Sequence, residues 1–550
     1  MKMNRQNQHI ILLYVLILAA ALCLGCAPVD RWPFWPPDYD DYTREPAVPL
    51  KETGNRYQPK MTDEPTVDLP MLGQPMPLSV EAAIIMALQN NRDLQIQRLN
   101  PVIAGTFERI ERGKYDPELF AEFEYVDEAA SETSRATGEQ FTVEGTNTSA
   151  AAGIRQELPT GTTLEAALER DRDQSNRAPD QRTTRLGLSI TQSLLRGFGP
   201  AVNLVNIRQA ELDLLASIYE LQGFTEALVA EIESAYWNYV LALEEIRIYE
   251  SSLKVAKKQR DEIEEQISVG LLPETEAAAA RAEVARREQA LINARSLMEE
   301  RRLKLLDLIN LNIASHLEKE IRATSEPFID PQAITNLAER LALAEKSRPD
   351  LAEARLRMKQ GRLETIATRN GMMPKLDLFI DLGRTGYAES FPEAFREFND
   401  NTYDFSAGVR LSHYLGNREA EARYEAAWTE EQQAKRAVDN LSHVVQLDVR
   451  LAVNEVERSR QQITASKATR QLEEQTVRAE KERFNVGAST ALLVAQAQRD
   501  LLASQIAEIR AIVNYRIALV ELYLAEGSLL QRRGITIGDY RIDNSIPLVK

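Results

Sequence analysis

The sequence lacks the motifs and residue clusters on which most enzymes depend. It contains no phosphate-binding loop of the GxxxxGK type, no HExxH motif and no GxSxG nucleophile elbow. Four histidines occur among 550 residues, and His316, His413 and His443 have no cysteine or histidine at metal-ligand spacing. We therefore expect no catalytic residues, no metal and no cofactor, so that any energy-requiring step must be driven by a partner.

Basic residues are fewer than acidic ones, and long apolar segments are scarce. The chain has 66 Lys and Arg against 83 Asp and Glu, a net charge of -17 at pH 7. Because phosphates are bound by a cationic face, this balance argues against nucleic acid as a partner. After the N-terminal segment, no apolar run reaches the roughly 20 residues of a transmembrane helix. If the mature chain spans a membrane, we expect a closed β-barrel, since open sheet edges stay unsatisfied in lipid.

Residues 1–25 are predicted to be a signal peptide. Lys2 and Arg5 precede an apolar run from Ile10 to Leu22, which is too short to span a membrane and suits a signal-peptide core. The only two cysteines follow in Cys23-Leu24-Gly25-Cys26, which resembles a bacterial lipobox. Cleavage before Cys26 would let that cysteine carry a lipid and would leave too few cysteines for an internal disulfide. The alternative is an ordinary signal peptide with incidental cysteines.

Most of the remaining chain is predicted to be an internal repeat. Asp93 and Pro117 match Asp350 and Pro374, and both pairs are 257 residues apart, as expected for a duplication. Residues 26–77, rich in Pro, Asp and Tyr, are predicted to lead from the lipid to the folded body as an extended segment. The predicted order is then a first repeat at 78–312, an equatorial linker at 313–334, a second repeat at 335–527 and a C-terminal tail at 528–550.

Each repeat contains strand-like stretches between helices. Alternate apolar residues from Leu119 to Tyr125, and again from Leu376 to Ile380, indicate strands with one apolar face. The first repeat has an additional hairpin signal at Leu158–Thr162. The chain therefore has about six strand-like segments if that hairpin joins the others, and about four if it does not. Either number is below the eight or so strands of the smallest membrane barrel, so several chains must share one barrel.

Long helices fill the rest of both repeats. No strong helix breaker occurs from Ala201 to Ser268 or from Arg418 to Asn485, so each helix would be on the order of 100 Å long. Each ends at a Val-Gly pair and precedes a shorter helix, Pro273–Asn310 or Thr490–Gly527. The apolar spacing of a coiled-coil seam occurs at Ile232, Tyr236, Tyr239, Leu243 and Ile246, and at Leu502, Ile506, Ile509 and Val513.

Several segments together resemble TolC-type outer-membrane efflux proteins. They are Gln192–Gly199, Tyr236-Trp237, Arg483–Gly487 and Ala497–Leu502, and the resemblance extends in order from Leu78 to Gly527. It implies an α+β membrane protein: a trimeric outer-membrane β-barrel above a long periplasmic α-helical, coiled-coil barrel. It further implies the passive exit duct of a tripartite efflux or type I-like export system. The partners would be two further copies, a periplasmic adaptor and an inner-membrane pump.

The resemblance also suggests site residues. In the family, the turns at the periplasmic ends of the helices meet the adaptor. We call the matching residues here the first tip, Val269, Gly270 and Leu271, and the second tip, Val486, Gly487 and Ala488. Because Ala488 stands where the family often has a bulkier residue, a weaker contact is expected at the second tip. The alternative is that the glycines only permit the turns.

A pore constriction is the second suggested site. Some family members close the duct with acidic residues in the helix after the second tip, where this chain has Leu493 and Gln496. That carboxylate ring is therefore absent, and an apolar or hydrogen-bonded constriction is the remaining possibility. Glu276, at the same step beyond Gly270, is interpreted as a solvated charge.

Two other functions are possible for such a chain. A stand-alone diffusion porin would share the barrel but has no use for helical pairs of about 100 Å. A periplasmic helical scaffold lipoprotein would leave the strands unexplained. The predicted location is the outer membrane, with a lipid anchor and a periplasmic extension.

Overall fold

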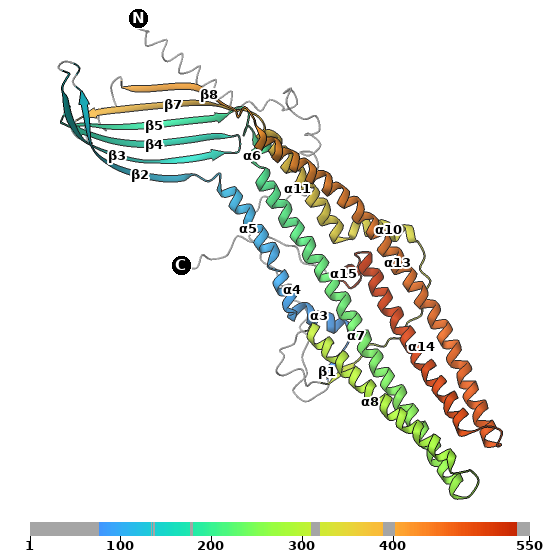
Figure 1. The fold of residues 1–550 in the computed structure, drawn as a ribbon. Helices are drawn as coiled ribbons and strands as arrows, with labels where there is room; N and C mark the ends of the chain where they lie inside the picture. The colour runs from blue at the N-terminus through green and yellow to red at the C-terminus, as the bar shows by residue number, and fades with distance from the viewer. Residues whose placement is uncertain are drawn as a thin grey trace. The chain divides into compact units, whose positions relative to one another are not determined.

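Six strands of the protein form one large antiparallel sheet (Figure 1). The computed structural model describes residues 76–133, 135, 138–176, 180–309, 320–388 and 402–535, all within one unit, Tyr57–Arg541. The predicted signal peptide, Cys26 and nearly all of the extended segment lie outside the described residues. The sheet order is β2-β3-β4-β5-β7-β8. Its strands are β2 Glu118–Thr133, β3 Gln140–Leu158, β4 Thr162–Ser175, β5 Gln181–Ser193, β7 Lys375–Ala388 and β8 Tyr403–Ser412.

The additional hairpin predicted near Leu158–Thr162 is the β3–β4 pair, and it belongs to the same sheet as the other strands. Strands β2 and β8 occupy the two edges, so each has one side without a partner strand in the described chain. Since every pair in the order is antiparallel, β2 and β8 run in opposite directions.

Two pairs of helices account for most of the helical structure. Helix α7 (Val205–Ser268) is followed by α8 (Thr275–Ile309), and α13 (Arg418–Asn485) is followed by α14 (Ala491–Ala525). With 64 residues, α7 is about 96 Å long. It begins four residues later than predicted, because Pro200–Asn203 forms a separate short helix, α6, whose C-cap is Leu204. Figure 1 shows the sheet at one end of these helices and the two tips at the other.

Shorter elements pack against the long helices between the sheet and the middle of these helices (Figure 1). Ser79 caps the helix Val80–Asn90, because its hydroxyl accepts a hydrogen bond from the Ala82 amide at 3.1 Å. A small parallel sheet joins β1 to β6. These elements are β1 Met76–Leu78, α3 Val80–Asn90, α4 Arg92–Gln97, α5 Asn100–Gly113, β6 Ile321–Ala323, α10 Leu337–Ser347, α11 Pro349–Gly371 and α15 Leu529–Arg532.

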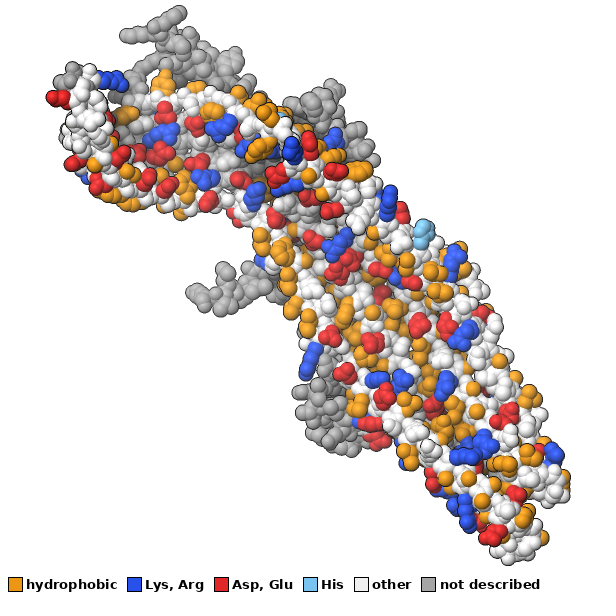
Figure 2. All heavy atoms as spheres, in the orientation of Figure 1, with side chains coloured by type: hydrophobic (Ala, Val, Ile, Leu, Met, Phe, Trp, Pro, Cys, Tyr) orange, Lys and Arg blue, Asp and Glu red, His pale blue; other side chains and the backbone are white. Residues whose placement is uncertain are grey.

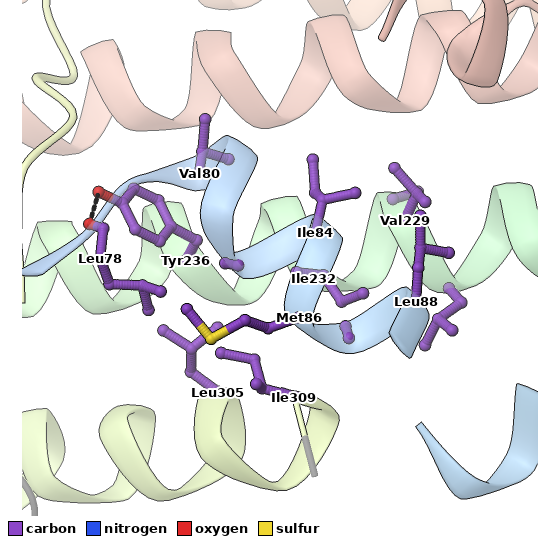
Figure 3. Close-up of a cluster of buried hydrophobic side chains, with 14 of the residues drawn as sticks. Leu78, Val80, Ile84, Met86, Leu88, Val229, Ile232, Tyr236, Leu305 and Ile309 are labelled. Atoms are coloured by element: carbon purple, nitrogen blue, oxygen red, sulfur yellow. Dashed lines mark hydrogen bonds between the residues drawn. The ribbon is translucent and has the colours of Figure 1, made fainter. Parts of the chain in front are cut away.

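The main hydrophobic core lies where α3, α7 and α8 meet (Figure 3). Ile232, Tyr236 and Tyr239 of the predicted seam are fully buried there. The hydroxyl of Tyr236 donates to the Leu78 carbonyl at 3.0 Å, and that of Tyr239 donates to the Ile321 carbonyl at 2.8 Å. The seam therefore fixes both strands of the small β1–β6 sheet. Burial of each such side chain contributes on the order of 2 kcal/mol.

The chain's end completes this core. Leu529 and Leu530 of α15 are buried in the same cluster as Leu78 and Ile232, although about 300–450 residues separate them in sequence. None of the helices in the described ranges combines the length and apolar character needed to cross a membrane.

Candidate functional site

The two tips have the same backbone structure. The Gly270 amide donates to the Ile267 carbonyl at 3.0 Å, and the Leu271 amide donates to the Gln266 carbonyl at 2.9 Å. At the second tip, Gly487 bonds in the same way to Phe484, and Ala488 to Arg483. These are the two hydrogen bonds of a Schellman motif, whose glycine adopts a positive φ. The φ values, +78° at Gly270 and +75° at Gly487, explain why glycine occupies both positions.

The tips present apolar side chains to solvent. Val269, Leu271 and Val486 are 65%, 74% and 76% exposed, and Ala488 is exposed as well. A Cβ atom added to Gly270 or Gly487 would meet no atom within 4 Å. At these exposures the apolar side chains contribute little to the stability of the fold. They are therefore suited to contact another molecule.

The two helical pairs are joined just behind the tips. Ile263, Ala280 and Ala491 form a small buried cluster that links α7, α8 and α14. Glu276 Oε2 accepts a hydrogen bond from the Ala491 amide at 3.1 Å and thereby satisfies a free N–H in the first turn of α14. The interpretation of Glu276 as a solvated charge was therefore wrong. The sequence could not show this contact, because the two residues are 215 positions apart.

Polar contacts continue this connection along α14. The Gln498 side-chain amide donates to Gln259 of α7 at 2.5 Å. Arg499 lies 3.0 Å from Glu283 of α8, which is itself buried beside Arg287 at 2.7 Å. Farther along, Arg510 pairs with Glu245 of α7 at 2.8 Å. These contacts hold the second helical pair against the first.

Leu493 and Gln496 lie one turn apart on α14, and both side chains are exposed. They point away from the buried residues Val494 and Ala497, which face the neighbouring helices. The two side chains are therefore free to meet another molecule or another copy of the chain. Their role in a constriction stays a prediction.

The large sheet has two chemically different faces, which follow from its register. One face, here called the apolar face, carries a continuous band across all six strands. Its residues are Leu119, Ala121, Phe123, Tyr125, Ala150, Ala152, Ile154, Leu164, Ala166, Leu168, Leu186, Leu188, Ile190, Leu378, Ile380, Leu382, Phe405, Ala407, Val409 and Leu411.

The opposite face, here called the acidic face, is dominated by carboxylates. Four basic residues share it, Arg155, Arg185, Lys375 and Arg410. Arg185 lies 3.1 Å from Glu169 and 2.7 Å from Asp404. The carboxylates of this face are Glu118, Glu122, Glu124, Glu128, Glu132, Glu157, Glu165, Glu169, Asp171, Asp173, Asp377, Asp381 and Asp404.

Apolar side chains are also exposed along the helices (Figure 2). Ile96, Leu99, Ile103, Phe107 and Ile110 follow the spacing of three and four residues that places them on one face of α4 and α5. A second exposed set on α13 comprises Trp428, Val444, Leu447, Leu451 and Leu472. The set on α4 and α5 is contiguous, and contiguous exposed apolar surface marks an interface, whereas the residues on α13 are spread along the helix.

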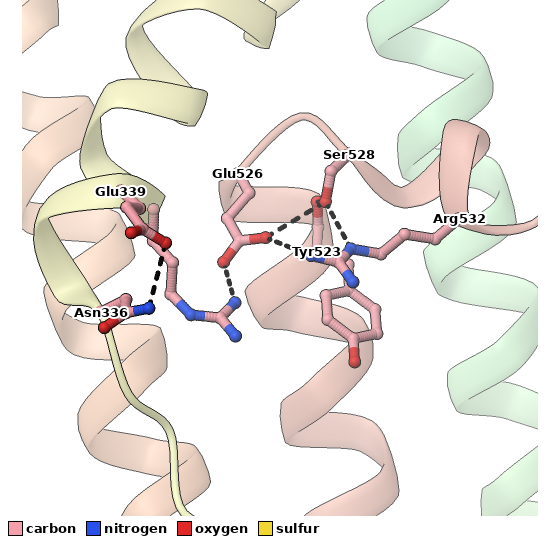
Figure 4. Close-up of polar contacts among 7 residues, drawn as sticks. Asn336, Glu339, Tyr523, Glu526, Ser528 and Arg532 are labelled. Atoms are coloured by element: carbon pink, nitrogen blue, oxygen red, sulfur yellow. Dashed lines mark hydrogen bonds and ion pairs between the residues drawn. The ribbon is translucent and has the colours of Figure 1, made fainter.

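Buried charges tie the C-terminal part of the chain to the helices. The Glu526 carboxylate has no exposed surface and pairs with Arg340 of α10 and Arg532 of α15 (Figure 4). The fully buried Glu233 of α7 pairs with Arg533, whose Nε lies 2.6 Å from Glu233 Oε1. Burial raises the pKa of Glu233, and the hydrogen bond from Arg533 partly offsets that rise. Sequence reasoning missed both pairs.

Comparisons with known proteins agree with this architecture. The model of a family described as outer membrane efflux protein matches residues 163–311 and 341–528, more than half of the chain. No curated protein gives a significant match. Within the described residues, no group of three or more His, Cys, Asp or Glu side chains is placed to hold a metal ion.

Three solved structures illustrate the likeness of fold. The outer-membrane channel OprN is 15% identical, with a TM-score of 0.61 over 86% of this chain and 99% of that chain. The CmeC outer membrane channel of Campylobacter jejuni is 15% identical, with a TM-score of 0.60 over 85% and 94%. The outer membrane protein VceC of Vibrio cholerae is 17% identical, with a TM-score of 0.59 over 82% and 96%.

Proposed function

Because the chain belongs to the outer membrane efflux protein family and is an outer-membrane efflux channel, we propose that three copies form the exit duct of a tripartite efflux or type I-like export system. The duct is passive: an inner-membrane pump delivers the substrate through a periplasmic adaptor. The family is one of efflux proteins rather than of enzymes. No nucleic acid takes part.

The two-faced sheet with open edges is the observation that carries this proposal. In the described residues of one chain, β2 and β8 each have one side without a partner strand. Their opposite directions suit antiparallel pairing between β8 of one copy and β2 of the next. A closed ring of three copies removes every edge, as a sheet in lipid requires. The apolar face then lies against lipid, and the acidic face lines the water-filled lumen.

The helices continue the duct into the periplasm. The apolar set on α4 and α5, from Ile96 to Ile110, and the set on α13 become buried between neighbouring copies. In the trimer, Leu493 and Gln496 of three copies line the constriction. The first and second tips, with the apolar side chains of Val269, Leu271 and Val486, dock the adaptor. A lipid on Cys26 would add an anchor in the outer membrane.

The purified protein is expected to be a trimer in detergent, because one chain has too few strands to close a barrel. Light scattering should give close to three times the mass of one mature chain. Cysteines placed on β2 and β8 should cross-link copies into a covalent trimer, and the trimer should conduct ions in planar bilayers. A monodisperse monomer that conducts ions would overturn the shared barrel and favour a stand-alone porin.

The acidic face predicts a preference for cations. At low salt, a lumen lined mainly by carboxylates attracts cations, so the reversal potential in a KCl gradient should have the sign of a cation-selective pore. Replacing Glu122, Glu124 and Glu128 with glutamine should move that potential toward zero and leave conductance largely intact. The matched control is Asp127→Asn with Glu144→Gln, which removes two charges from the opposite face, one on β2 and one on its neighbour β3. Equal effects of the two variants would mean that the acidic face does not line the lumen.

A further inference from the structure

The first half of the chain contributes four strands to the sheet, whereas the second contributes two. The difference is the β3–β4 hairpin, which lies between β2 and β5. It is paired along both sides: β3 with β2 from Glu118 to Thr133, and β4 with β5 from Thr162 to Asp173. A hairpin paired on both sides is a section of the wall, and it cannot fold into the lumen without breaking both ladders.

The turn of this hairpin is fixed to the junction between sheet and helices. Gly161 has a φ of +81°, and a Cβ there would lie 2.1 Å from the Gly197 carbonyl oxygen. The Asn203 side-chain amide donates to the carbonyls of Pro159 and Gly197, both at 2.9 Å. The Gly199 amide donates to the Thr160 carbonyl at 3.1 Å. The hairpin is thus built into the base of the sheet.

The hairpin also continues both faces of its neighbours. On the apolar face, Leu164 and Leu168 of β4 lie opposite Ile190 and Leu186 of β5. On the acidic face, Glu169 lies opposite Arg185 and forms an ion pair with it at 3.1 Å. The same lipid-facing and lumen-facing assignment therefore applies to the hairpin as to the rest of the wall.

Insertion of a hairpin leaves the directions of the two edge strands unchanged. Since β2 and β5 are antiparallel to each other, an order of β2-β5-β7-β8 would present the same two edges to neighbouring copies as the observed order does. Three copies can therefore close a ring with or without the hairpin. Only the circumference changes.

We propose that the β3–β4 hairpin widens the exit of the duct, so that the trimer's barrel has eighteen strands where it would otherwise have twelve, and admits bulky solutes. This inference rests on the proposed trimeric duct. With strands about 4.8 Å apart and tilted about 40°, eighteen strands give a backbone radius of about 18 Å, against about 12 Å for twelve. Allowing about 5 Å for inward side chains leaves an opening about 26 Å across, against about 14 Å.

A lipid-quenching experiment on the full-length chain tests the hairpin's place in the wall. Single cysteines at Leu168 of β4 and Leu382 of β7, both on the apolar face, are labelled with a fluorophore in vesicles containing brominated lipid. Their neighbours Glu169 and Asp381, on the acidic face, are the matched controls and should not be quenched. The proposal expects equal quenching at positions 168 and 382.

The outcomes separate this inference from the proposed function. Quenching at position 382 without quenching at 168 would show that the hairpin lies outside the wall, and would overturn the wider barrel alone. Quenching at neither position would overturn the lipid-facing sheet, and with it the proposed duct.

Excision of residues 140–175, which joins β2 to β5 through the remaining loop residues, measures the width directly. Polyethylene glycols of graded size are added on the barrel side of a bilayer, where polymers small enough to enter the barrel raise the resistance of that segment. The size cut-off of the full-length protein should be about twice that of the excision variant. Equal cut-offs would overturn the proposal. If the variant does not assemble, the quenching comparison decides.

Discussion

Export is expected to fall by about tenfold or more when Leu271 and Val486 are both replaced by glutamate. Both side chains are more than 70% exposed, so the substitutions should cost little folding free energy. A charged carboxylate at each tip would instead have to be desolvated against the adaptor, which opposes docking. The measurement compares export by intact cells with the conductance of the purified variant in bilayers, and only export should fall.

The control for this variant is Leu271→Met with Val486→Ile, which keeps both tips apolar and should leave export unchanged. Gly270→Asn separates surface chemistry from backbone geometry, since asparagine tolerates a positive φ and has open space at this position. Unchanged export in the glutamate variant would leave the tips with no role beyond reversing the chain. A parallel loss of conductance would instead indicate misassembly.

Removal of the Arg533 side chain in Arg533→Met should destabilise the protein by about 3 kcal/mol at pH 7, because it leaves the fully buried Glu233 carboxylate without its partner. Burial already raises the pKa of Glu233 in the native protein, and loss of Arg533 should raise it further. A native-state pKa above the unfolded value favours folding of the protonated form. The loss of stability should therefore be small near pH 4 and grow as the pH rises through the unfolded pKa, about 4.5.

Chemical denaturation of the detergent-solubilised protein at pH 5 and pH 7 measures this difference. Glu233→Gln combined with Arg533→Met is the matched variant, since a neutral amide needs no cation, and it should recover most of the lost stability at pH 7. A loss that is the same at both pH values would mean that Arg533 acts by packing, and that its charge is not needed.

Features set by neighbouring residues could be predicted from the sequence. The long helices end at Ser268 and Asn485 as expected, because each is followed by a Val-Gly pair whose glycine adopts a positive φ. The Leu158–Thr162 signal correctly indicated a hairpin, since alternation and turn residues are local. Tyr236 was predicted as a seam residue from its spacing, and it is fully buried.

Contacts between distant segments could not be predicted in this way. Glu276 bonds to the Ala491 amide, and Glu233 pairs with Arg533 across 300 positions, but a charged residue on a helix carries no local sign of its partner. The apolar spacing likewise did not predict where the buried part of the seam ends. Leu243 is only partly buried, because it lies at the margin of the core cluster.

The position of α15 has a consequence for the order in which the protein can fold. Chains emerge and fold from the N-terminus, and α7 is complete long before Leu529 and Leu530 arrive. Until then, the apolar pocket that these leucines fill stays open and Glu233 has no cation beside it. In a chain that ends before Arg533, the apolar surface at the centre therefore stays exposed to solvent. Such a chain is a ready substrate for proteases. Helix α15, the last helix in the described residues, therefore closes the core only after the rest of the described chain has been made.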